Sequence, residues 1–457
     1  MAMEKEGFRA IRKTQRRARL STTQIIALVF LGIILLGTLL LMLPVSSADG
    51  KSTSFMDALF TATSATCVTG LVVGDTGTIW SGFGQTVIIL MIEIGGLGFM
   101  SAAAMMFFLL RKKVGLRQRM VIAQALSLDD MESVVRIQKL VIGGSLAIQG
   151  VAAILLALRF LIYVPFATAV KWGLFHSVSA FCNAGFDIFG YNDSVMHFAS
   201  DPIVLSILMI LVVVGGLGFF VWEELIRHKS IKKCSVYTKL VLITTAALLV
   251  LGTVMTLLLE WDNPKTLGSM SWGDKILNSI FQSVTLRTAG FAAIDQAFLT
   301  DGSKALSVVL MLIGGSSGST AGGLKTVTFI VLILFLGARL RGRDSVNVFR
   351  RRIPEKKVLD AMTIVGLVVG LTMIGTIVIT ATSPIGFADS IYEAASALGT
   401  VGLTAGATGK LSLVGRILIV IFMYFGRVGV LTLSMGFLLG NQAKSRYEYA
   451  QTNLMIG

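Results

Sequence analysis

Long apolar segments recur along the whole chain. Crossing a bilayer takes about 20 consecutive apolar residues. Eight segments approach or exceed that length: Thr22–Leu43, Thr86–Leu110, Leu140–Tyr163, Ile203–Ile226, Leu240–Glu260, Leu306–Leu340, Val358–Thr380 and Leu411–Leu439. The basic leader before the first could also mark a signal peptide, but the length of the segment and the spans after it favour a membrane helix. The pattern predicts an all-α polytopic membrane protein with eight transmembrane helices.

A shorter, half-apolar stretch ending in glycine lies between the two members of each consecutive pair of spans. The four stretches are Phe55–Gly70, Trp172–Gly185, Ile276–Gly290 and Ile391–Gly402. Each is too short for a full crossing together with its loop. Non-helical backbone at membrane depth is tolerated where protein or a water-filled cavity surrounds it. We therefore expect four re-entrant half-helices.

These stretches are copies of one repeat. Aligned on their last glycines they read FTATSATCVTGL, FHSVSAFCNAGF, FQSVTLRTAGF and YEAASALGTVGL, at intervals of 115, 105 and 112 residues. The pattern predicts four span–re-entrant P-loop–span units with pseudo-fourfold symmetry around one central pore. Their expected limits are 22–119, 120–236, 237–350 and 351–440, between a cytoplasmic N-terminus (1–21) and a cytoplasmic C-terminal tail (441–457).

Composition and charge support this reading. The chain is 54% apolar and 14% charged, whereas soluble domains carry roughly 25% charge, which excludes a soluble enzyme and a nucleic-acid-binding domain. The net charge is +15, and most basic residues occupy segments on the side opposite the glycine-ending stretches. The positive-inside rule then places both termini in the cytoplasm. The three cysteines show no spacing typical of a disulfide framework or a zinc site.

The residues at the end of each stretch suit an ion filter built from backbone. They are small or medium-sized and uncharged: Val68, Thr69, Gly70; Asn183, Ala184, Gly185; Thr288, Ala289, Gly290; Thr400, Val401, Gly402. Glycine permits backbone angles that aim carbonyls at an axis, and rings of carbonyls replace the water shell of a potassium ion. The negative C-terminal end of each preceding helix would favour a cation.

A second glycine motif recurs in phase with the first. The spans carry IGGLGF, VGGLGF, IGGSSG and FGRVG, whose first glycines follow the filter glycine by 25, 30, 24 and 24 residues. One such motif alone is as readily a helix-packing site. Four in register favour a shared feature beneath the filter.

At these motifs the chain resembles the Trk/Ktr/HKT superfamily of potassium transport proteins, most of all the KtrB-type membrane subunit. The resemblance runs from about Thr22 to the end of the fourth repeat. Potassium-preferring members have glycine at the filter position and some sodium-preferring plant members have serine in the first loop, so four glycines imply selectivity for K⁺. Cys182 and Leu286 depart from the family pattern, which has Asn commonly at the first and a small residue or Pro at the second.

The resemblance also implies partners and a location. It implies a homodimer in the cell membrane, surrounded by lipid, and a separate cytosolic KtrA-like ring that alone binds nucleotides; no nucleic acid is expected. The basic segments Arg111–Arg119, Arg227–Lys239 and Arg339–Lys357 would form the docking surface of the ring. The tail ending in LMIG could insert at the dimer contact.

A gate is expected beneath the filter. Ten small residues, too rich in Gly and Ser for a helix, interrupt the sixth span: Gly314, Gly315, Ser316, Ser317, Gly318, Ser319, Thr320, Ala321, Gly322 and Gly323. Their likeness to a phosphate-binding loop fails because Leu324 intervenes before Lys325 and no soluble strand precedes them. Arg427 lies at the matching place of the fourth repeat, where a charge at membrane depth suggests function. It could bond this loop, and Glu93 could pair with it.

Alternatives remain at this stage. The sequence does not separate channel-like K⁺ flux from sodium-coupled symport, in which Na⁺ would also bind. A membrane receptor or assembly subunit without transport would not need four glycines in register. No nucleophile–base pair or transition-metal constellation supports an enzyme, so we assign no catalytic residue.

Overall fold

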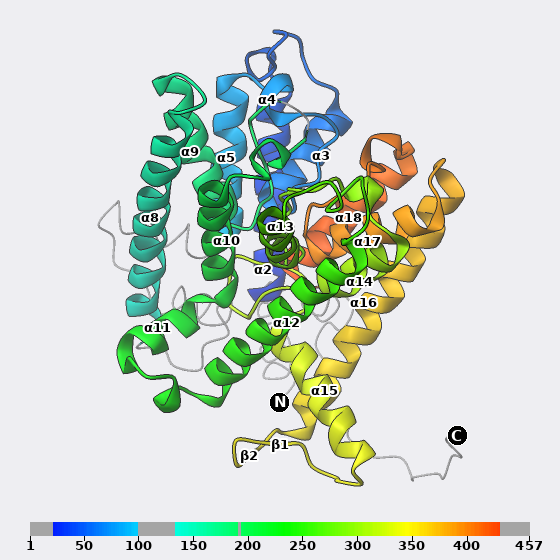
Figure 1. Ribbon diagram of the computed structural model, residues 1–457. Coiled ribbons are helices and arrows are strands. Elements are labelled where there is room, and N and C mark those ends of the chain that lie inside the picture. The colour runs from blue at the N-terminus through cyan, green and yellow to red at the C-terminus, as the bar shows by residue number, and fades with distance from the viewer. Residues whose placement is uncertain (1–21, 99–132, 191–192, 430–457) are drawn as a thin grey trace, which may run out of the picture.

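The computed structural model is almost entirely helical, and it describes residues 22–98, 133–190 and 193–429 (Figure 1). The first two groups of elements are α2 (Thr22–Leu41), η1 (Pro44–Ser46), α3 (Phe55–Thr66), α4 (Thr76–Ile79) and α5 (Gly82–Leu97), then α8 (Ser133–Phe160), α9 (Phe166–Phe181), η2 (Met196–Phe198), α10 (Pro202–Leu217) and α11 (Phe219–His228). The N-terminal segment 1–21, the basic segment Arg111–Arg119 and the tail 441–457 lie outside the described residues.

The other two groups complete the chain. They are η3 (Ile231–Lys233), α12 (Val236–Glu260), α13 (Trp272–Thr285), η4 (Gln296–Phe298), α14 (Asp301–Leu312) and α15 (Thr326–Leu340), then α16 (Glu355–Thr382), α17 (Phe387–Gly399), η5 (Thr408–Lys410) and α18 (Leu413–Val428). A two-stranded hairpin of β1 (Asn347–Val348) and β2 (Arg351–Arg352) joins α15 to α16.

Four helices within the described residues are long and apolar enough to cross a membrane by themselves. They are α2, α8, α12 and α16, with mean hydropathy of 2.2–2.7 over their spans. Large apolar side chains on them stay exposed, such as Ile154 at 63%, Leu258 at 70% and Ile377 at 66%. An apolar surface of this kind suits contact with lipid.

The helix in the other span of each pair ends part-way along the expected segment, which the sequence predicted only for the third; we call these the broken spans. The parts of Thr86–Leu110 and Leu411–Leu439 that follow Gly98 and Gly429 lie outside the described residues. The segments Thr86–Leu110, Ile203–Ile226 and Leu411–Leu439 were expected as continuous spans, but α5, α10 and α18 end at Leu97, Leu217 and Val428. The next residue is a glycine in each case, with φ of 80°, 93° and 95° at Gly98, Gly218 and Gly429. Such a φ cannot continue a right-handed helix. After Gly218 the chain bends by 93° into α11.

Helix contacts follow a cyclic order. Each long helix packs most extensively against the short helix of its own group: α2 on α3, α8 on α9, α12 on α13 and α16 on α17. Each broken span then packs against the short helix of the following group: α5 on α9, α10 on α13, α14 on α17, and α18 back on α3. The last contact joins the fourth group of elements to the first. The four short helices therefore lie inside a closed ring of helix contacts.

The short helices are buried because of their composition. Their C-terminal halves are rich in small and hydroxylated residues and lack Lys and Arg, and α3 is buried continuously from Phe60 to Thr66. Side chains cap the N-termini of two of them: the Ser54 side chain accepts from Asp57 N in α3, and the Ser271 side chain accepts from Asp274 N in α13. Capping satisfies amide donors that a helix start leaves free.

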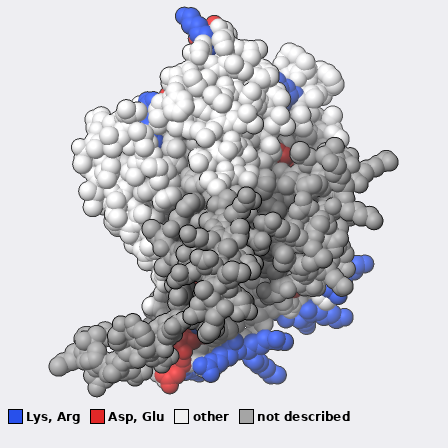
Figure 2. Space-filling view, turned by 180° about the vertical axis from the view of Figure 1, so that it is seen from behind, with Lys and Arg blue, Asp and Glu red and all other residues white. Residues whose placement is uncertain are grey.

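Basic residues gather at one end of the molecule. Figure 2 shows Lys and Arg side chains along the lower end, where α15 and the hairpin project in Figure 1. The hairpin turn places Phe349 and Arg350 at φ of 46° and 62°, and Arg350, Arg351 and Arg352 are exposed.

Candidate ion pathway

The four glycine loops share one backbone conformation. Two residues before each glycine, the chain adopts a positive φ, at Val68 (56°), Asn183 (58°), Thr288 (68°) and Thr400 (52°). The glycines themselves follow with φ of 92° at Gly70, 67° at Gly185, 84° at Gly290 and 94° at Gly402. Positive φ is uncommon for residues other than glycine, so its recurrence at equivalent positions indicates that the loops are structural copies.

The four loops meet in a ring. A Cβ placed on Gly70 would lie 2.5 Å from the carbonyl oxygen of Ala184, and one on Gly185 would lie 2.8 Å from that of Ala289. On Gly290 it would meet the Val401 carbonyl, and on Gly402 the Thr69 carbonyl, closer still. Each glycine therefore lies against the carbonyl group of the residue that precedes the glycine of the next loop. The glycine of the fourth loop lies in the same way against the first loop. A side chain at any of the four positions would collide with the neighbouring loop.

Amide groups in the ring are bonded away from its centre. The N–H groups of Thr69, Ala184, Ala289 and Val401 donate to backbone carbonyls of their own short helices at 2.8–3.0 Å. These four amides therefore do not bond to the carbonyl groups of the glycine loops. A ring of backbone oxygens suits a hard alkali cation and offers nothing to a transition metal.

Buried hydroxyl groups support the loops, and the sequence analysis did not single them out. Ser64 Oγ accepts from Gly70 N, and Ser396 Oγ from Gly402 N, both at 3.1 Å. Ser179 and Thr285 instead donate to the carbonyls of Phe186 and Phe291 at 2.7 Å. Three of these hydroxyls precede their glycine by six residues and one by five, a regularity that the alignment of the repeats contained.

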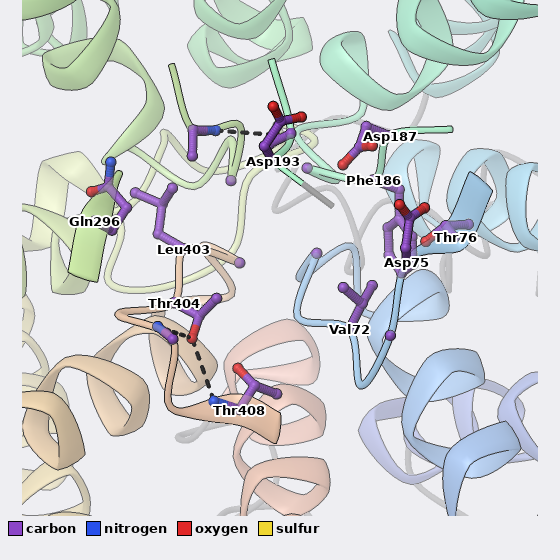
Figure 3. A pocket seen from close by; sticks show the side chains of 18 of the residues that line it. Val72, Asp75, Thr76, Phe186, Asp187, Asp193, Gln296, Leu403, Thr404 and Thr408 are labelled. Carbon is purple, nitrogen blue, oxygen red and sulfur yellow. Dashed lines mark hydrogen bonds between the residues drawn. The ribbon is translucent and has the colours of Figure 1, made fainter. Parts of the chain in front are cut away.

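A cavity of about 440 Å³ opens outside the ring, and the four glycines line its floor. Figure 3 shows Asp75 and Asp187 together in its wall, with Gln296 and Thr404 opposite. Asp193 and Asp295 also line it, and within the described residues its lining holds no Lys or Arg. Burial, followed by the charges of Asp75 and Asp193, raises the pKa of Asp187 to about 7. The cavity is an acidic entrance to the ring.

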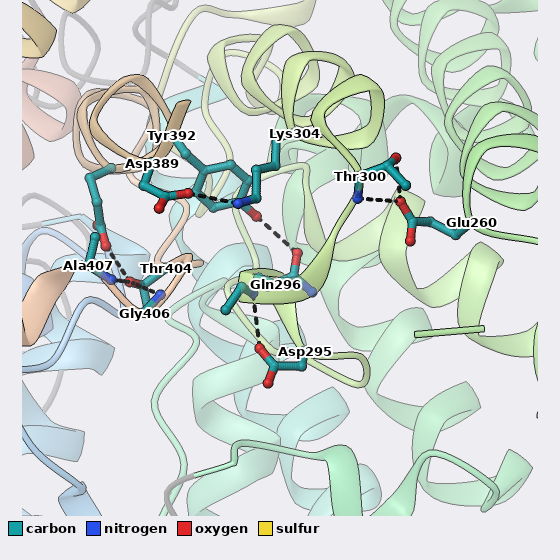
Figure 4. Close-up of polar contacts among 12 residues, drawn as sticks. Glu260, Asp295, Gln296, Thr300, Lys304, Asp389, Tyr392, Thr404, Gly406 and Ala407 are labelled. Carbon is teal, nitrogen blue, oxygen red and sulfur yellow. Dashed lines mark hydrogen bonds and ion pairs between the residues drawn. The ribbon is translucent and has the colours of Figure 1, made fainter. Parts of the chain in front are cut away.

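Polar contacts behind this cavity connect the third and fourth groups of elements (Figure 4). Tyr392 of α17 donates from its hydroxyl to Gln296 Oε1 at 2.9 Å. Lys304 of α14 pairs with Asp389 of α17 at 2.7 Å. Within the third group, Glu260 at the end of α12 accepts from the Thr300 hydroxyl at 2.7 Å. These bonds fix the wall of the entrance.

The segment Gly314–Gly323 is a loop between α14 and α15, as its composition predicted. It packs against the break in the second group: Ser316 N donates to Gly216 O at 3.1 Å, and Phe219 N donates to Gly318 O at 2.9 Å. A Cβ on Gly322 would meet the Thr400 side chain, which places the loop against the fourth glycine loop. We call Gly314–Gly323 the intramembrane loop.

Arg427 reaches this loop across the ring of repeats. Its Nη1 donates to Thr320 O, and its Nη2 donates to Gly95 O and, at 2.9 Å, to Gly96 O. The arginine thus joins the intramembrane loop to the break in the first group, and the expected bond to the loop is present. Glu93 was a candidate partner for Arg427, but Glu93 Oε2 instead accepts from Gln149 at 3.0 Å and contacts Cys182 Sγ at 3.3 Å.

Comparison with known proteins gives a consistent picture. The family profile of TrkH, described as a cation transport protein, matches residues 5–446. The chain is 38% identical over 452 residues to the potassium/sodium uptake protein NtpJ of Enterococcus hirae, covering 98% of this chain and all of that one. It is 38% identical to the Ktr system potassium uptake protein B of Bacillus subtilis, covering 95% and 97%.

A solved structure shares the fold. The potassium transporter TrkH from Vibrio parahaemolyticus aligns with a TM-score of 0.71 at 18% identity, over 93% of this chain and 86% of that one. At this identity the likeness concerns the arrangement of the helices alone.

Proposed function

The chain belongs to the TrkH family of membrane cation transport proteins, and from that membership we propose that it takes up potassium ions across the cell membrane through the ring formed by Gly70, Gly185, Gly290 and Gly402. The proposal includes the full architecture expected from the sequence: eight spans, four re-entrant loops and one pore on a pseudo-fourfold axis. The cyclic packing of α3, α9, α13 and α17 against the neighbouring broken spans supports it.

The observation that carries the proposal is the closed contact of four glycines with four carbonyls. The filter residues Thr69, Ala184, Thr288 and Thr400 are fully buried, so their backbone is shielded from bulk water. A dehydrated cation on the axis would replace its water shell with the loop carbonyls. The short helices end at this ring, and their negative C-terminal ends favour a cation there.

The acidic entrance would raise the local concentration of cations outside the ring. Carboxylates in a cavity with low-dielectric walls focus the field and attract counter-ions. The potassium ion is then the transported substrate, and nothing in the proposal requires a further cofactor on this chain.

The gate of this pathway is the intramembrane loop together with Arg427. The loop lies against Thr400, and Arg427 holds it to the carbonyls of Gly95 and Gly96. A guanidinium below the filter also opposes the passage of a cation. Breaking the bond from Arg427 to Thr320 would remove one of the contacts that hold the loop in the pathway.

The assembly is proposed by analogy with relatives. One relative is named as part of a Ktr system, and we propose a homodimer with a cytosolic, nucleotide-binding KtrA-like ring. The exposed arginines of the hairpin lie on the basic end of the molecule, which would be cytoplasmic with both termini. The ring would dock there.

A second candidate is sodium-coupled potassium symport. One relative at 38% identity is named a potassium/sodium uptake protein, which favours testing Na⁺ as a co-substrate. Potassium uptake measured at fixed K⁺ with and without Na⁺ separates the two: coupling requires uptake to rise with external Na⁺, and a channel-like pathway does not.

The direct test of the pathway is a crystal of the protein grown with rubidium in place of potassium. The anomalous signal of rubidium is expected inside the ring of the four glycines. A signal only elsewhere, in protein that transports rubidium, would refute the assignment of the ring as the filter.

A further inference from the structure

Three residues before each filter glycine, the four repeats differ in chemistry. The residues at this position are Cys67, Cys182, Arg287 and Gly399. In the second repeat, a Cβ on Gly96 would lie 2.6 Å from Cys182 Sγ, so this position faces the break in the preceding repeat. Arg287 occupies the corresponding place in the third repeat and lines a small cavity together with Gly216 and Gly315. A charged side chain thus stands where its equivalents are small and uncharged.

Arg287 holds the two ends of the intramembrane loop. Its Nη2 lies 3.4 Å from Gly314 O and 3.2 Å from Thr326 Oγ1. Thr326 closes the same point, because its Oγ1 donates to Gly314 O and its N–H to Gly315 O, both at 3.0 Å. We call this junction of Gly314, Gly315 and Thr326 the neck of the loop.

The hydrogen bonds to the neck are the main compensation for burying the charge of Arg287. The side chain is 8% exposed, and no carboxylate forms an ion pair with it among the described residues. Its Nε has no hydrogen-bond partner. A buried charge without an opposite charge is costly unless hydrogen bonds compensate it. The oxygens of Gly314 and Thr326 supply the bonds that the structure records.

Arg287 and Arg427 act at opposite places in the ring of repeats. Arg427 bridges the fourth repeat to the carbonyls of Gly95 and Gly96 in the first. Arg287 lies between α13 and α10, where the third repeat packs on the second. Arg427 binds the middle of the loop at Thr320, whereas Arg287 binds its neck. The two arginines therefore hold the loop at two separate points, in addition to its bonds with the break in the second group.

We propose that Arg287 is a positioning residue that couples the neck of the intramembrane loop to the filter loop of the third repeat. The coupling is direct because Thr288, Ala289 and Gly290 follow Arg287 without an intervening residue. When Arg427 releases Thr320, the loop pivots about a neck that Arg287 keeps closed. The filter loop of the third repeat then keeps its position while the gate moves. This inference rests on the proposed function of the ring and the loop.

The test is potassium uptake with sodium competition in transport-deficient cells, scored as the preference for K⁺ over Na⁺. Arg287→Gln should lower that preference by about tenfold, the equilibrium factor for one hydrogen bond to a charged group. Arg287→Lys should keep most of it, because a single nitrogen makes both contacts. Thr326→Val, which removes one acceptor of Arg287, should lower it by a smaller factor. Arg416→Gln, a matched control that breaks an outer ion pair with Asp57, should leave it unchanged.

Arg427→Ala distinguishes the role of the gate from that of the neck. This variant should raise potassium flux and leave the preference for K⁺ over Na⁺ unchanged. The inference is overturned if Arg287→Gln inserts normally and keeps the wild-type preference, or if Arg287→Lys loses as much as Arg287→Gln. If Arg287→Gln does not insert, Thr326→Val decides, and an unchanged preference there refutes the coupling. Gly70→Ser distinguishes a failure of this inference from a failure of the proposed function. If Gly70→Ser also retains the full preference for K⁺ over Na⁺, the filter assignment itself is refuted.

Discussion

Replacing Gly70 by serine tests the filter most directly. At φ of 92°, residue 70 lies outside the regions that L-amino acids favour, and the new Cβ would lie 2.5 Å from the carbonyl oxygen of Ala184. The first loop must shift, the carbonyl of the second loop must shift, or both. Ala184 O belongs to the ring, so either movement changes the oxygen cage around the ion.

The magnitude follows from the backbone strain. Holding a residue other than glycine at such a φ costs of order 1–3 kcal/mol. That cost lowers the population of the ring-forming conformation by about 5–150-fold, since every 1.4 kcal/mol is tenfold. If the relaxed loop discriminates poorly, the preference for K⁺ over Na⁺ should fall by about one to two orders of magnitude.

The assay is competitive uptake of K⁺ and Na⁺ by transport-deficient cells, with the membrane content of each variant measured in parallel. Gly50→Ser is the matched control: Gly50 also has a positive φ, of 67°, but a Cβ there meets nothing within 4 Å. It carries backbone strain without the contact to a neighbouring loop, and its ion preference should be that of the wild type. Wild-type preference in Gly70→Ser at normal membrane content would refute the reasoning.

Three further predictions concern the gate, the docking surface and the entrance. Deleting Gly314–Gly323 or changing Arg427 to Ala should raise potassium uptake and reduce its dependence on the cytosolic partner, whereas a fall in uptake by inserted protein would make the loop a structural support. Reversing the charges of the three hairpin arginines (Arg350, Arg351 and Arg352) should weaken copurification with the partner ring, most strongly at low salt; copurification that is unaltered at all salt concentrations would leave these residues as topology signals. The pKa of Asp187 is raised to about 7, so this carboxyl gains its negative charge as the pH rises from 6 to 8. Apparent K⁺ affinity should rise over that range and Asp187→Asn should flatten the profile; an identical pH profile in that variant would contradict the role of Asp187.

Local properties of the sequence predicted much of this protein. The long apolar helices α2, α8, α12 and α16 follow from the length of the apolar segments alone, because a bilayer imposes that length. The four glycine loops follow from a repeated glycine, and glycine is the residue that tolerates their positive φ without strain. The intramembrane loop follows from ten consecutive small residues that do not favour a helix. Each of these features depends on residues close together in the chain.

Only the tertiary structure decided which residues far apart in the chain contact one another. Gly98, Gly218 and Gly429 break their spans, but their sequence surroundings are apolar and read as continuous helix. The partner of Glu93 proved to be Gln149 with Cys182, 56 and 89 residues away, and no local pattern specifies such a pairing. The sequence analysis gave Arg287 no role, and its contact with Gly314 places it at the neck of the loop. The cost of a buried charge depends on the atoms that surround it, and only the folding of the intramembrane loop beside α13 brings the oxygens of Gly314 and Thr326 to Arg287.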